Sequence, residues 1–560
     1  RKLAGGMLNL KTGELDFGIA YGSPPGKFTV NEFLAADGVQ GPYRLTSSEG
    51  SPNILIIPNS EKVYLNGIAL KRGELEDYTI DYSTSEITFT IKNLLTKNTR
   101  IMVEFEYSDQ QYERSFVSIT SNGKFFNGKL HSNILLMQEG DLEDSPVDFV
   151  MTDENRKILE LAGNDKLKAS RESITFVGID SATGKGLGQY SIRDTVINGN
   201  NIKYYLYNPG SVDAVFSIRF SYIGEGKGSY IRESFLVHKW VGEGKGDYQP
   251  INLLPMPERK RFASWNLSYQ PDSALVISNE LAISNYEANK LSLVDDRGIS
   301  GIGIDTKLKY KIATPEMFDW GKGKMSIALR NYYVSDKFKT PNKSNEIDYY
   351  HAWNINDSLD AKKNIFTLDF DYDPSKILSI GYQFSNNNYG YASRAQRNII
   401  NFSLTDEIYP QFKLTVTDIS NKESTFESSF SNQTYETFYR VQGIKINGRF
   451  LNESKEVFDK EKANLITGYE IKAFSGGIGH SFGRKSEIGY EIEYREDFSP
   501  MYSQLRKESS RIVNKLNINY SELNDIFIQL NGGFQKKNIN PDFKLLNKGN
   551  DMSLFVKSLL

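Results

Sequence analysis

The feature that most constrains the fold is a series of long runs in which apolar and polar side chains alternate one by one. The series begins near Phe262, and its runs are roughly ten residues long. Alternation with a period of two is that of a β-strand, whose successive side chains point to opposite faces of a sheet. In one late run, Tyr490 and Ile492 share one face, whereas Glu491 and Glu493 share the other. Such runs predict strands that separate an apolar environment from a wet one.

Other runs divide in the same way, so each predicted strand has an apolar face and a charged face. We expect the apolar faces to meet lipid and the charged faces to line the lumen of a barrel. The predicted lipid-facing residues are Ile304, Leu308, Leu368, Phe370, Tyr490 and Ile492, and the predicted lumen-facing residues are Lys307, Lys309, Lys311, Asp369, Asp371, Glu491 and Glu493.

The connections between the runs also alternate, between tight turns and longer polar segments. The predicted turns are Pro271–Ser273, Asp373–Ser375, Asp406–Ile408, Gly483–Ser486 and Ser521–Asp525, and the predicted long loops are Asn285–Ser300, Ser335–Lys362, Ser420–Gln433 and Phe498–Ser510. Short turns at one rim and long loops at the other are typical of an outer-membrane β-barrel, with the long loops outside the cell. The clear runs predict roughly 12 to 14 strands or more in Phe262–Leu560. The register of Ile444–Ala473 cannot be predicted.

A soluble β-sandwich or β-propeller also produces alternating strands. Such folds use strands of roughly five or six residues with loops of similar length at both ends. Longer strands, unequal loops, and Tyr or Phe near many strand ends favour a membrane barrel, where aromatic residues gather at the headgroup level. The predicted fold class is therefore all-β, an antiparallel transmembrane barrel.

Composition excludes several classes of function. The net charge is -3, so the chain has no overall positive field to attract nucleic acid. The sequence has 0 cysteines, which excludes disulfides and thiolate chemistry, and its 4 histidines lack the spacing of a metal site. No metal, cofactor or catalytic residue is predicted. Because the chain opens at Arg1 without Met, we expect a processed or trimmed segment of a longer product.

The first 250 residues lack the long runs. Residues 1–118 predict a β-sandwich-like domain, with a hairpin turn at Asn66-Gly67 and a half-buried strand from Ile101 to Tyr107. Residues 119–250 predict a second β-rich region with one short helix, Asp153–Ala162, capped by Asp153 and ended by Gly163. Residues 251–261 predict a Pro-rich linker, and residues 262–560 the barrel.

Three motifs could carry chemistry, but each has a simpler structural explanation. The near copies Gly224–Tyr230 and Gly242–Tyr248 lack the Lys-Ser/Thr step of a phosphate loop, so glycine turns explain them better. His480 lies on the apolar face of a predicted strand without a catalytic partner, as an interfacial histidine would. Asp369, Asp371 and Asp373 lack the turn and the bidentate Glu of a calcium loop, so lumen-facing charge is favoured.

The segments Ser60–Gly73, Asp77–Tyr82, Glu86–Thr90 and Val103–Asp109 resemble part of large outer-membrane-associated proteins of Bacteroidota. The resemblance covers roughly the first half of the chain and implies a largely uncharacterised cell-envelope protein, with an amino-terminal β-domain ahead of a barrel. It supplies no catalytic residue.

The resulting hypothesis is a non-catalytic outer-membrane barrel that serves as a subunit of an envelope complex for protein secretion, insertion or uptake. Its expected partners are outer-membrane lipid and other envelope proteins, and its amino-terminal region is expected in the periplasm or within the barrel. A stand-alone channel for small solutes is the alternative, and an outer-membrane hydrolase is disfavoured. We expect Met552–Leu560 either to close the barrel against Phe262–Gln270 or to be the trimmed end of the ordered region.

Overall fold

The structure is a computed structural model in which β-strands predominate. It describes residues 4–559 except 25, 49, 53, 75, 91, 94, 109–110, 148, 198, 235–236, 295–298, 317–321, 342–345, 356–360, 391–392, 407, 462–463, 483–485, 524–525 and 544–551. Within the described residues, no helix has the length and apolar character needed to cross a membrane.

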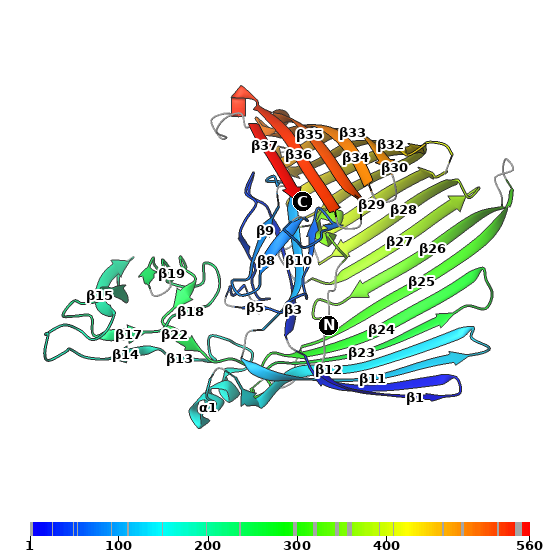
Figure 1. Cartoon of the computed structure of the whole chain (residues 1–560). Coiled ribbons are helices and arrows are strands. Elements are labelled where there is room, and N and C mark those ends of the chain that lie inside the picture. The colour runs from blue at the N-terminus through cyan, green and yellow to red at the C-terminus, as the bar shows by residue number, and fades with distance from the viewer. Residues whose placement is uncertain are drawn as a thin grey trace.

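A single 19-stranded antiparallel sheet, called the wall here, curves around the molecule (Figure 1). Its strands are β1 (Ala4–Thr12), β2 (Leu15–Ser23), β11 (Tyr112–Phe125), β12 (Leu130–Pro146), β23 (Arg259–Tyr269), β24 (Leu275–Glu287), β25 (Ile299–Glu316), β26 (Lys322–Val334), β27 (Lys363–Asp373), β28 (Leu378–Tyr389), β29 (Ser393–Leu404), β30 (Gln411–Lys422), β31 (Phe426–Val441), β32 (Ile444–Asp459), β33 (Leu465–Phe482), β34 (Ser486–Met501), β35 (Gln504–Leu523), β36 (Ile526–Ile539) and β37 (Met552–Leu559). The predicted all-β antiparallel barrel fold is confirmed.

The wall begins earlier in the chain than the sequence predicts. β1 pairs with β2, β2 with β11, β11 with β12, and β12 with β23. The predicted domain boundaries at residues 118, 250 and 262 therefore need correction. Four wall strands, β1, β2, β11 and β12, precede the predicted start of the barrel at residue 262, and two domains are inserted between wall strands rather than placed ahead of a barrel.

Of the two alternatives for Met552–Leu560, the pairing with Phe262–Gln270 is wrong. β23 lies between β12 and β24, and β37 pairs with β36. Within the part of the chain that the structure describes, β1 and β37 are the two edges of the sheet and do not pair with each other.

The two rims of the wall differ among the earlier strands, whereas from β28 onward short connections occur at both rims. Consecutive strands such as β31 and β32 are joined at one rim by short turns, whereas the inserted domains and the connection from Val334 to Lys363 leave from the other. Two predicted loops were wrong, because most of Ser420–Gln433 and Phe498–Ser510 belongs to β30, β31, β34 and β35. There the outward-facing residues turn polar while the hydrogen-bonded ladder continues, so the alternation disappears before the strand ends.

The first inserted domain, called the inner domain here, comprises residues 27–108 and lies on the concave side of the wall (Figure 1). Its strands are β3 (Lys27–Leu34), β4 (Tyr43–Arg44), β5 (Leu55–Ile56), β6 (Lys62–Leu65), β7 (Ile68–Ala69), β8 (Tyr78–Asp81), β9 (Glu86–Phe89) and β10 (Arg100–Ser108). They form two small sheets around one apolar core, as in a β-sandwich, but over residues 27–108 rather than the predicted 1–118. β10 is buried on both faces rather than half-buried, because Met102, Glu104 and Glu106 are also covered.

The second inserted domain, called the outer domain here, comprises residues 147–258 and lies beyond the ends of β12 and β23 (Figure 1). Its elements are α1 (Asp153–Ala162), β13 (Ser170–Glu172), β14 (Ile174–Phe176), β15 (Tyr190–Ile197), β16 (Asn200–Tyr207), β17 (Phe216–Ile218), β18 (Ser221–Tyr222), β19 (Tyr230–Arg232), β20 (His238–Trp240), β21 (Tyr248–Gln249) and β22 (Ile251–Leu253). The helix bounds match the prediction, but the amino-terminal cap is Thr152, whose side chain accepts a hydrogen bond from the backbone N–H of Asn155.

The repeated glycine motifs lie in the outer domain and form turns. Gly226 and Gly244 have φ values of 66° and 68°, which favour glycine. Gly228 and Gly246 face each other in a β-bridge, and a Cβ on Gly228 would lie 2.4 Å from the backbone nitrogen of Tyr248. These glycines therefore serve backbone packing.

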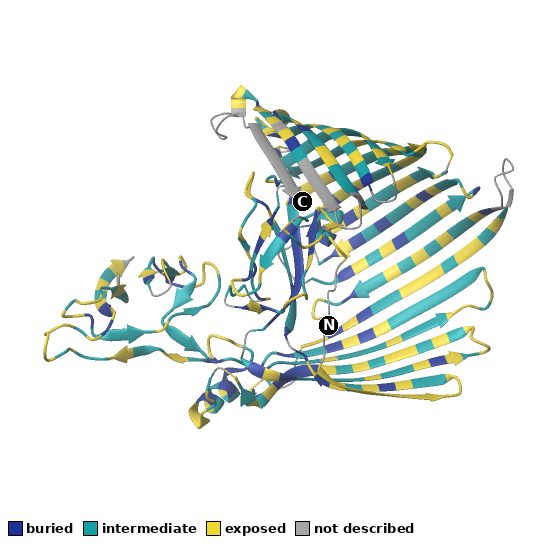
Figure 2. Ribbon diagram, viewed as in Figure 1, coloured by how far each residue is buried: buried dark blue, intermediate teal, exposed yellow. Residues whose placement is uncertain are grey.

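The outer face of the wall is apolar over a broad band. Figure 2 shows exposed residues alternating with less exposed ones along many wall strands. The exposed apolar side chains include Ile302, Leu308, Tyr310, Ile327, Leu329, Phe366, Ile380, Tyr382, Ile400, Phe412, Ile446, Phe450, Phe474, Ile478, Ile488, Tyr490, Ile492, Tyr494, Ile512, Leu516 and Phe534.

Candidate functional site: the contact between the inner domain and the wall

The tip of the inner domain, as the term is used here, consists of two neighbouring turns, Asn66-Gly67 and Thr96–Thr99, and the adjoining Arg100. The Asn66-Gly67 turn joins β6 to β7, and the Asn66 side-chain oxygen accepts a hydrogen bond of 2.9 Å from the backbone N–H of Arg100. In the neighbouring turn, the Thr99 hydroxyl accepts a hydrogen bond of 2.9 Å from the backbone N–H of Thr96. These bonds fix the backbone from which the charged side chains of the tip extend.

Arg100 makes the central contact of this tip. Its guanidinium donates to both carboxylate oxygens of Asp348, at 2.9 to 3.1 Å, and lies 3.9 Å from Glu453 of β32. Asp348 precedes the short helix α2 (Tyr349–Ala352) in the connection between β26 and β27. A bidentate arginine–carboxylate pair fixes orientation as well as distance. The pair therefore joins the inner domain to a segment 248 residues later in the chain.

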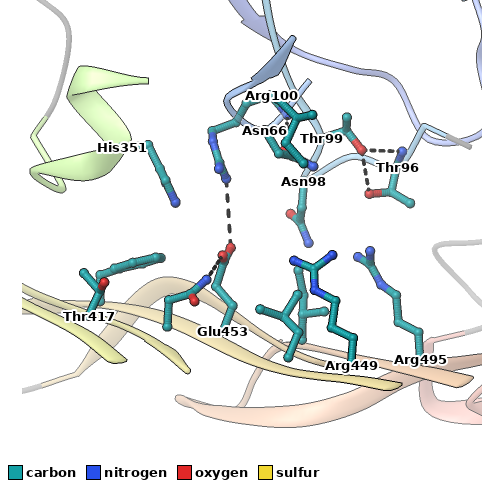
Figure 3. A pocket seen from close by; sticks show the side chains of 15 residues that line it. Asn66, Thr96, Asn98, Thr99, Arg100, His351, Thr417, Arg449, Glu453 and Arg495 are labelled. Carbon is teal, nitrogen blue, oxygen red and sulfur yellow. Dashed lines mark hydrogen bonds and ion pairs between the residues drawn. The ribbon is translucent and has the colours of Figure 1, made fainter. Parts of the chain in front are cut away.

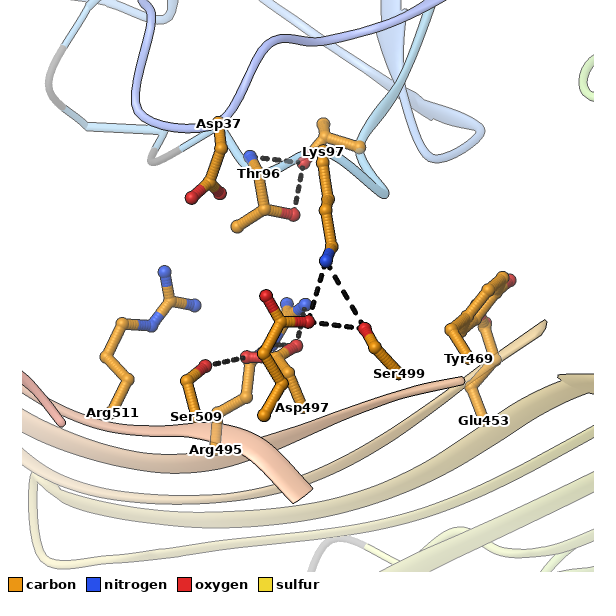
Figure 4. A network of polar contacts seen from close by, with 12 residues as sticks. Asp37, Thr96, Lys97, Glu453, Tyr469, Arg495, Asp497, Ser499, Ser509 and Arg511 are labelled. Carbon is orange, nitrogen blue, oxygen red and sulfur yellow. Dashed lines mark hydrogen bonds and ion pairs between the residues drawn. The ribbon is translucent and has the colours of Figure 1, made fainter. Parts of the chain in front are cut away.

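Two more polar contacts extend this interface along the wall (Figure 4). The Lys97 ammonium lies 2.6 Å from Glu508 of β35 and donates to the Ser499 hydroxyl of β34 at 3.2 Å. Lys537 of β36 donates to Asp37 at 3.2 Å. The inner domain thus contacts the last third of the wall through charged and hydroxyl groups.

The connection that carries α2 is held to the wall differently. Its Tyr349, Trp353 and Ile355 form an apolar core with Tyr389 and Ala395 of the wall. The Arg397 guanidinium covers the Trp353 ring at 4.2 Å, a cation–π contact. This segment, predicted as an external loop, folds inward and is part of the wall's inner lining.

By contrast, the apolar core of the inner domain consists of residues from that domain alone. Burial of apolar surface is the main stabilising contribution in folding, whereas the contacts of this domain with the wall described above are ion pairs and hydrogen bonds. The inner domain is therefore a self-contained body held to the wall mainly by polar contacts.

A cavity of about 380 Å³ lies between the tip and the wall (Figure 3). Its polar lining includes Asn66, Thr96, Asn98, Thr99, Arg100, His351, Thr417, Asn432, Arg449, Glu453 and Arg495. Burial lowers the pKa of His351 to about 2, with help from the positive charges of Arg100 and Lys455. The imidazole is therefore neutral near pH 7, and its ring packs edge-on against Phe430.

A second charged cluster, called the hub here, lies where both inserted domains leave and rejoin the wall. Arg114, near the start of β11, lies 3.0 to 3.1 Å from Glu139 and Asp141 of β12 and from Glu258, which precedes β23. Lys27, the first residue of the inner domain, lies 3.9 Å from Glu258. Burial alone would raise the pKa of Glu258, but Lys260, Lys27 and Arg114 hold it well below its ordinary value.

The predicted lumen-facing residues lie on the face of the wall that carries these contacts. Asp369 accepts a hydrogen bond from Gln383, Asp371 accepts one from Ser326, and Glu493 lies 3.4 Å from Arg511. Lys307 pairs with Asp305 of its own strand. Lys309 and Lys311 of β25 share this inward face with Asp369 and Asp371 of β27, but β26, with Ala328 and Ser326, lies between them. Glu491 is opposite Lys515.

The predicted lipid-facing residues lie on the opposite face. Leu308 and Tyr490 are exposed, and so is Ile492. Leu368 and Phe370 are half-buried between their cross-strand neighbours, as is Ile304. His480 follows the same face, beside the Phe482 ring.

The functional contacts were not predicted from the sequence. Asn66-Gly67 is a recognisable turn, but nothing near Arg100 indicates a partner at Asp348. Within the described residues, no group of His, Asp and Glu side chains suitable for a metal ion is found.

Comparison with known proteins matches the inner domain alone to a family. Residues 28–109 match a family model described as a domain of unknown function, DUF8818. No curated protein matches the chain.

Among solved structures, the FrpB iron transporter from Neisseria meningitidis, in its F5-1 variant apoprotein form, is similar over 95% of this chain and 73% of its own, with 10% identity and a TM-score of 0.35. The siderophore receptor PirA from Acinetobacter baumannii is similar over 80% of this chain and 71% of its own, with 8% identity and a TM-score of 0.23.

Proposed function

We propose that the chain is a non-catalytic outer-membrane β-barrel protein whose inner domain is a removable plug. In this proposal it serves as a gated subunit of an envelope complex for uptake or secretion. The observation that carries the proposal is the contrast at the inner face of the wall: the α2 segment is fixed by an apolar core, whereas the inner domain has its own core and is held by ion pairs. A body of this kind can leave without unfolding.

The apolar outer face supports a membrane location. Its exposed Ile, Leu, Phe and Tyr side chains would otherwise face water over many adjacent strands, and contiguous apolar patches of that extent mark a membrane or a protein interface. The charged inward face suits a wet lumen.

The edges of the wall are unpaired in the described part of the chain. Unpaired backbone groups cost several kcal/mol each in hydrocarbon. Because β1 and β37 do not pair with each other in the described part of the chain, both edges need additional β-structure when the wall is in a bilayer.

Removal of the plug tests this function directly. Residues 27–108 can be replaced by a short glycine–serine linker, since β2 and β11 are neighbouring strands on either side of the insertion. Cells that carry this variant should become sensitive to vancomycin, a large hydrophilic antibiotic that intact outer membranes exclude. The triple variant Asp37→Ala, Lys97→Ala and Arg100→Ala, which removes the three charged contacts, should also sensitise them.

A matched variant controls for damage to the domain itself. Lys92→Ala with Glu76→Ala removes an ion pair of 3.1 Å within the inner domain, and these cells should remain as resistant as the wild type. Resistance of the deletion variant, with the protein shown to be present in the outer membrane, would contradict a plug function. Sensitivity of wild-type cells would show that the inner domain does not close the lumen.

Topology provides a second prediction. If the short turns are periplasmic, the outer domain, which leaves from the opposite rim, faces the cell exterior rather than the periplasm. The chain has 0 cysteines, so single-cysteine variants can be labelled selectively. A membrane-impermeant maleimide should label Glu225→Cys in an outer-domain turn on intact cells, but label Ser273→Cys, in the turn between β23 and β24, only after lysis. The reverse labelling pattern would show that the barrel has the opposite orientation in the membrane.

A further inference from the structure

We propose that the cavity between the inner-domain tip and the wall is a binding site for a small hydrophilic oxyanion, a carboxylate or a phosphate. This goes beyond the gating function, because binding can be measured without any assay of permeability. The cavity volume of about 380 Å³ falls within the range of known small-molecule sites, roughly 300–1,000 Å³.

Positive charge outweighs negative charge in the lining. Three guanidiniums line the cavity, from Arg100 of the tip and from Arg449 and Arg495 of the wall, whereas Glu453 is the only carboxylate among its described lining residues. Arginine forks match the planar, paired oxygens of carboxylates and phosphates.

Each guanidinium keeps N–H groups that make no hydrogen bond among the described residues, although Nη1 of Arg100 forms an ion pair with Glu453 at 3.9 Å. Arg100 bonds Asp348 through Nε and Nη2, and Arg495 bonds Asp497 through Nε and Nη2. The Nη1 group of each has no hydrogen bond among the described residues. Arg449 is the least satisfied, because its one carboxylate contact among the described residues is Glu436 at 3.5 Å from Nε, and about half of its side-chain surface is exposed.

Neutral donors face the same space from the tip. Figure 3 shows the Asn98 amide directed toward the Arg449 guanidinium, with Arg495 beside Thr96. Among the described residues, the Asn98 side chain has no hydrogen-bond partner, and an amide and a guanidinium can both donate to an oxyanion placed between them. The donors that remain after the contacts with Asp348, Glu436, Glu453 and Asp497 converge on one space, where an oxyanion could accept from them.

Binding at this site would depend on the position of the inner domain, because one half of the lining belongs to the inner-domain tip and the other half to the wall. An anion held by Arg449 and Arg495 on one side and by Asn98 on the other binds only while the tip is seated. By linkage, such a ligand favours the seated position of the inner domain. The inferred ligand is therefore one that keeps the lumen closed.

Binding to the full-length protein, purified in detergent, tests the site. Titration calorimetry with citrate and with inorganic phosphate as separate probes should give one site for at least one of them, and sucrose should give none. Binding of citrate alone identifies a carboxylate site, and binding of phosphate alone identifies a phosphate site. Arg449→Gln and, from the opposite body, Asn98→Ala should each weaken binding at least tenfold.

Arg506→Gln is the matched control, since Arg506 is exposed near the β34–β35 turn and does not line the cavity. Absence of binding by both probes would overturn the inference, as would equal affinity in the wild type and Arg449→Gln. An effect of Arg449→Gln without any effect of Asn98→Ala would overturn the bridging role. If the anion binds but cells with the plug deletion stay resistant to vancomycin, the binding site is supported and the gating function is contradicted.

Discussion

Replacement of Arg114 by alanine is expected to destabilise the protein by about 3–5 kcal/mol, the cost of removing one partner from a buried ion cluster. Arg114 is almost fully buried and contacts Glu139, Asp141 and Glu258 at 3.0 to 3.1 Å. Without the guanidinium, the buried carboxylates repel one another at the point where both inserted domains join the wall. Urea unfolding of the purified protein in lipid measures the loss of unfolding free energy.

The control is Arg506→Ala, an exposed arginine outside the hub, which should change the unfolding free energy by less than about 0.5 kcal/mol. Arg114→Lys should recover part of the loss, because it restores the charge but not the forked geometry. Equal losses for Arg114→Ala and Arg506→Ala would show that the hub does not stabilise the junctions.

The pH dependence gives an independent check on the hub. The pKa of Glu258 is held below its ordinary value in the folded protein. Its contribution to stability is therefore fully present above the unfolded pKa of about 4.3 and is lost as the pH falls through the lower folded value. The difference between wild type and Arg114→Ala should be largest near pH 7 and narrow as the pH falls, because protonation relieves the repulsion among the buried carboxylates in the variant. A constant difference down to pH 3 would contradict this assignment.

The strands of the wall could be predicted where one face meets an apolar medium and the other meets water. Leu368 and Asp369 illustrate this, because adjacent residues with opposite character require opposite surroundings. The same rule failed at Ser429 and Ser431, where the outward side chains turn polar although the ladder with β30 continues. Hydrophobic periodicity reports the medium around a strand and does not report hydrogen bonding.

The position of the inserted domains could not be predicted for a topological reason. Tyr21 of β2 pairs with Val117 of β11 across an insertion of about eighty residues, and no local pattern shows that a strand returns to a sheet it has left. The candidate site could not be predicted from the sequence for the same topological reason. Arg100 begins β10 and Asp348 lies within the connection between β26 and β27, and only the curvature of the wall brings these two ordinary charged residues together.

Substitution of Leu368 by arginine should destabilise the protein by about 2–4 kcal/mol if this side chain lies near the middle of the bilayer. Leu368 is the central residue of β27 (Lys363–Asp373), on the outward face with Leu329 of β26 and Phe384 of β28 as cross-strand neighbours. A guanidinium there must leave water or distort the lipid. Urea unfolding in lipid measures the effect.

Asp369→Asn is the matched control, because it is the next residue on the same strand but faces the lumen. Its hydrogen bond from Gln383 can still be accepted by the asparagine oxygen, so the loss should be well below that of Leu368→Arg. Ile492→Arg near the middle of β34, with Glu491→Gln as its neighbour control, repeats the comparison on a distant strand. Only a bilayer on the outward side would make the outward substitution in each pair much more costly than the inward one. Equal losses within each pair, or arginine variants as stable as the wild type, would show that the outward face is covered by something other than a bilayer, and the proposed membrane location would then be wrong.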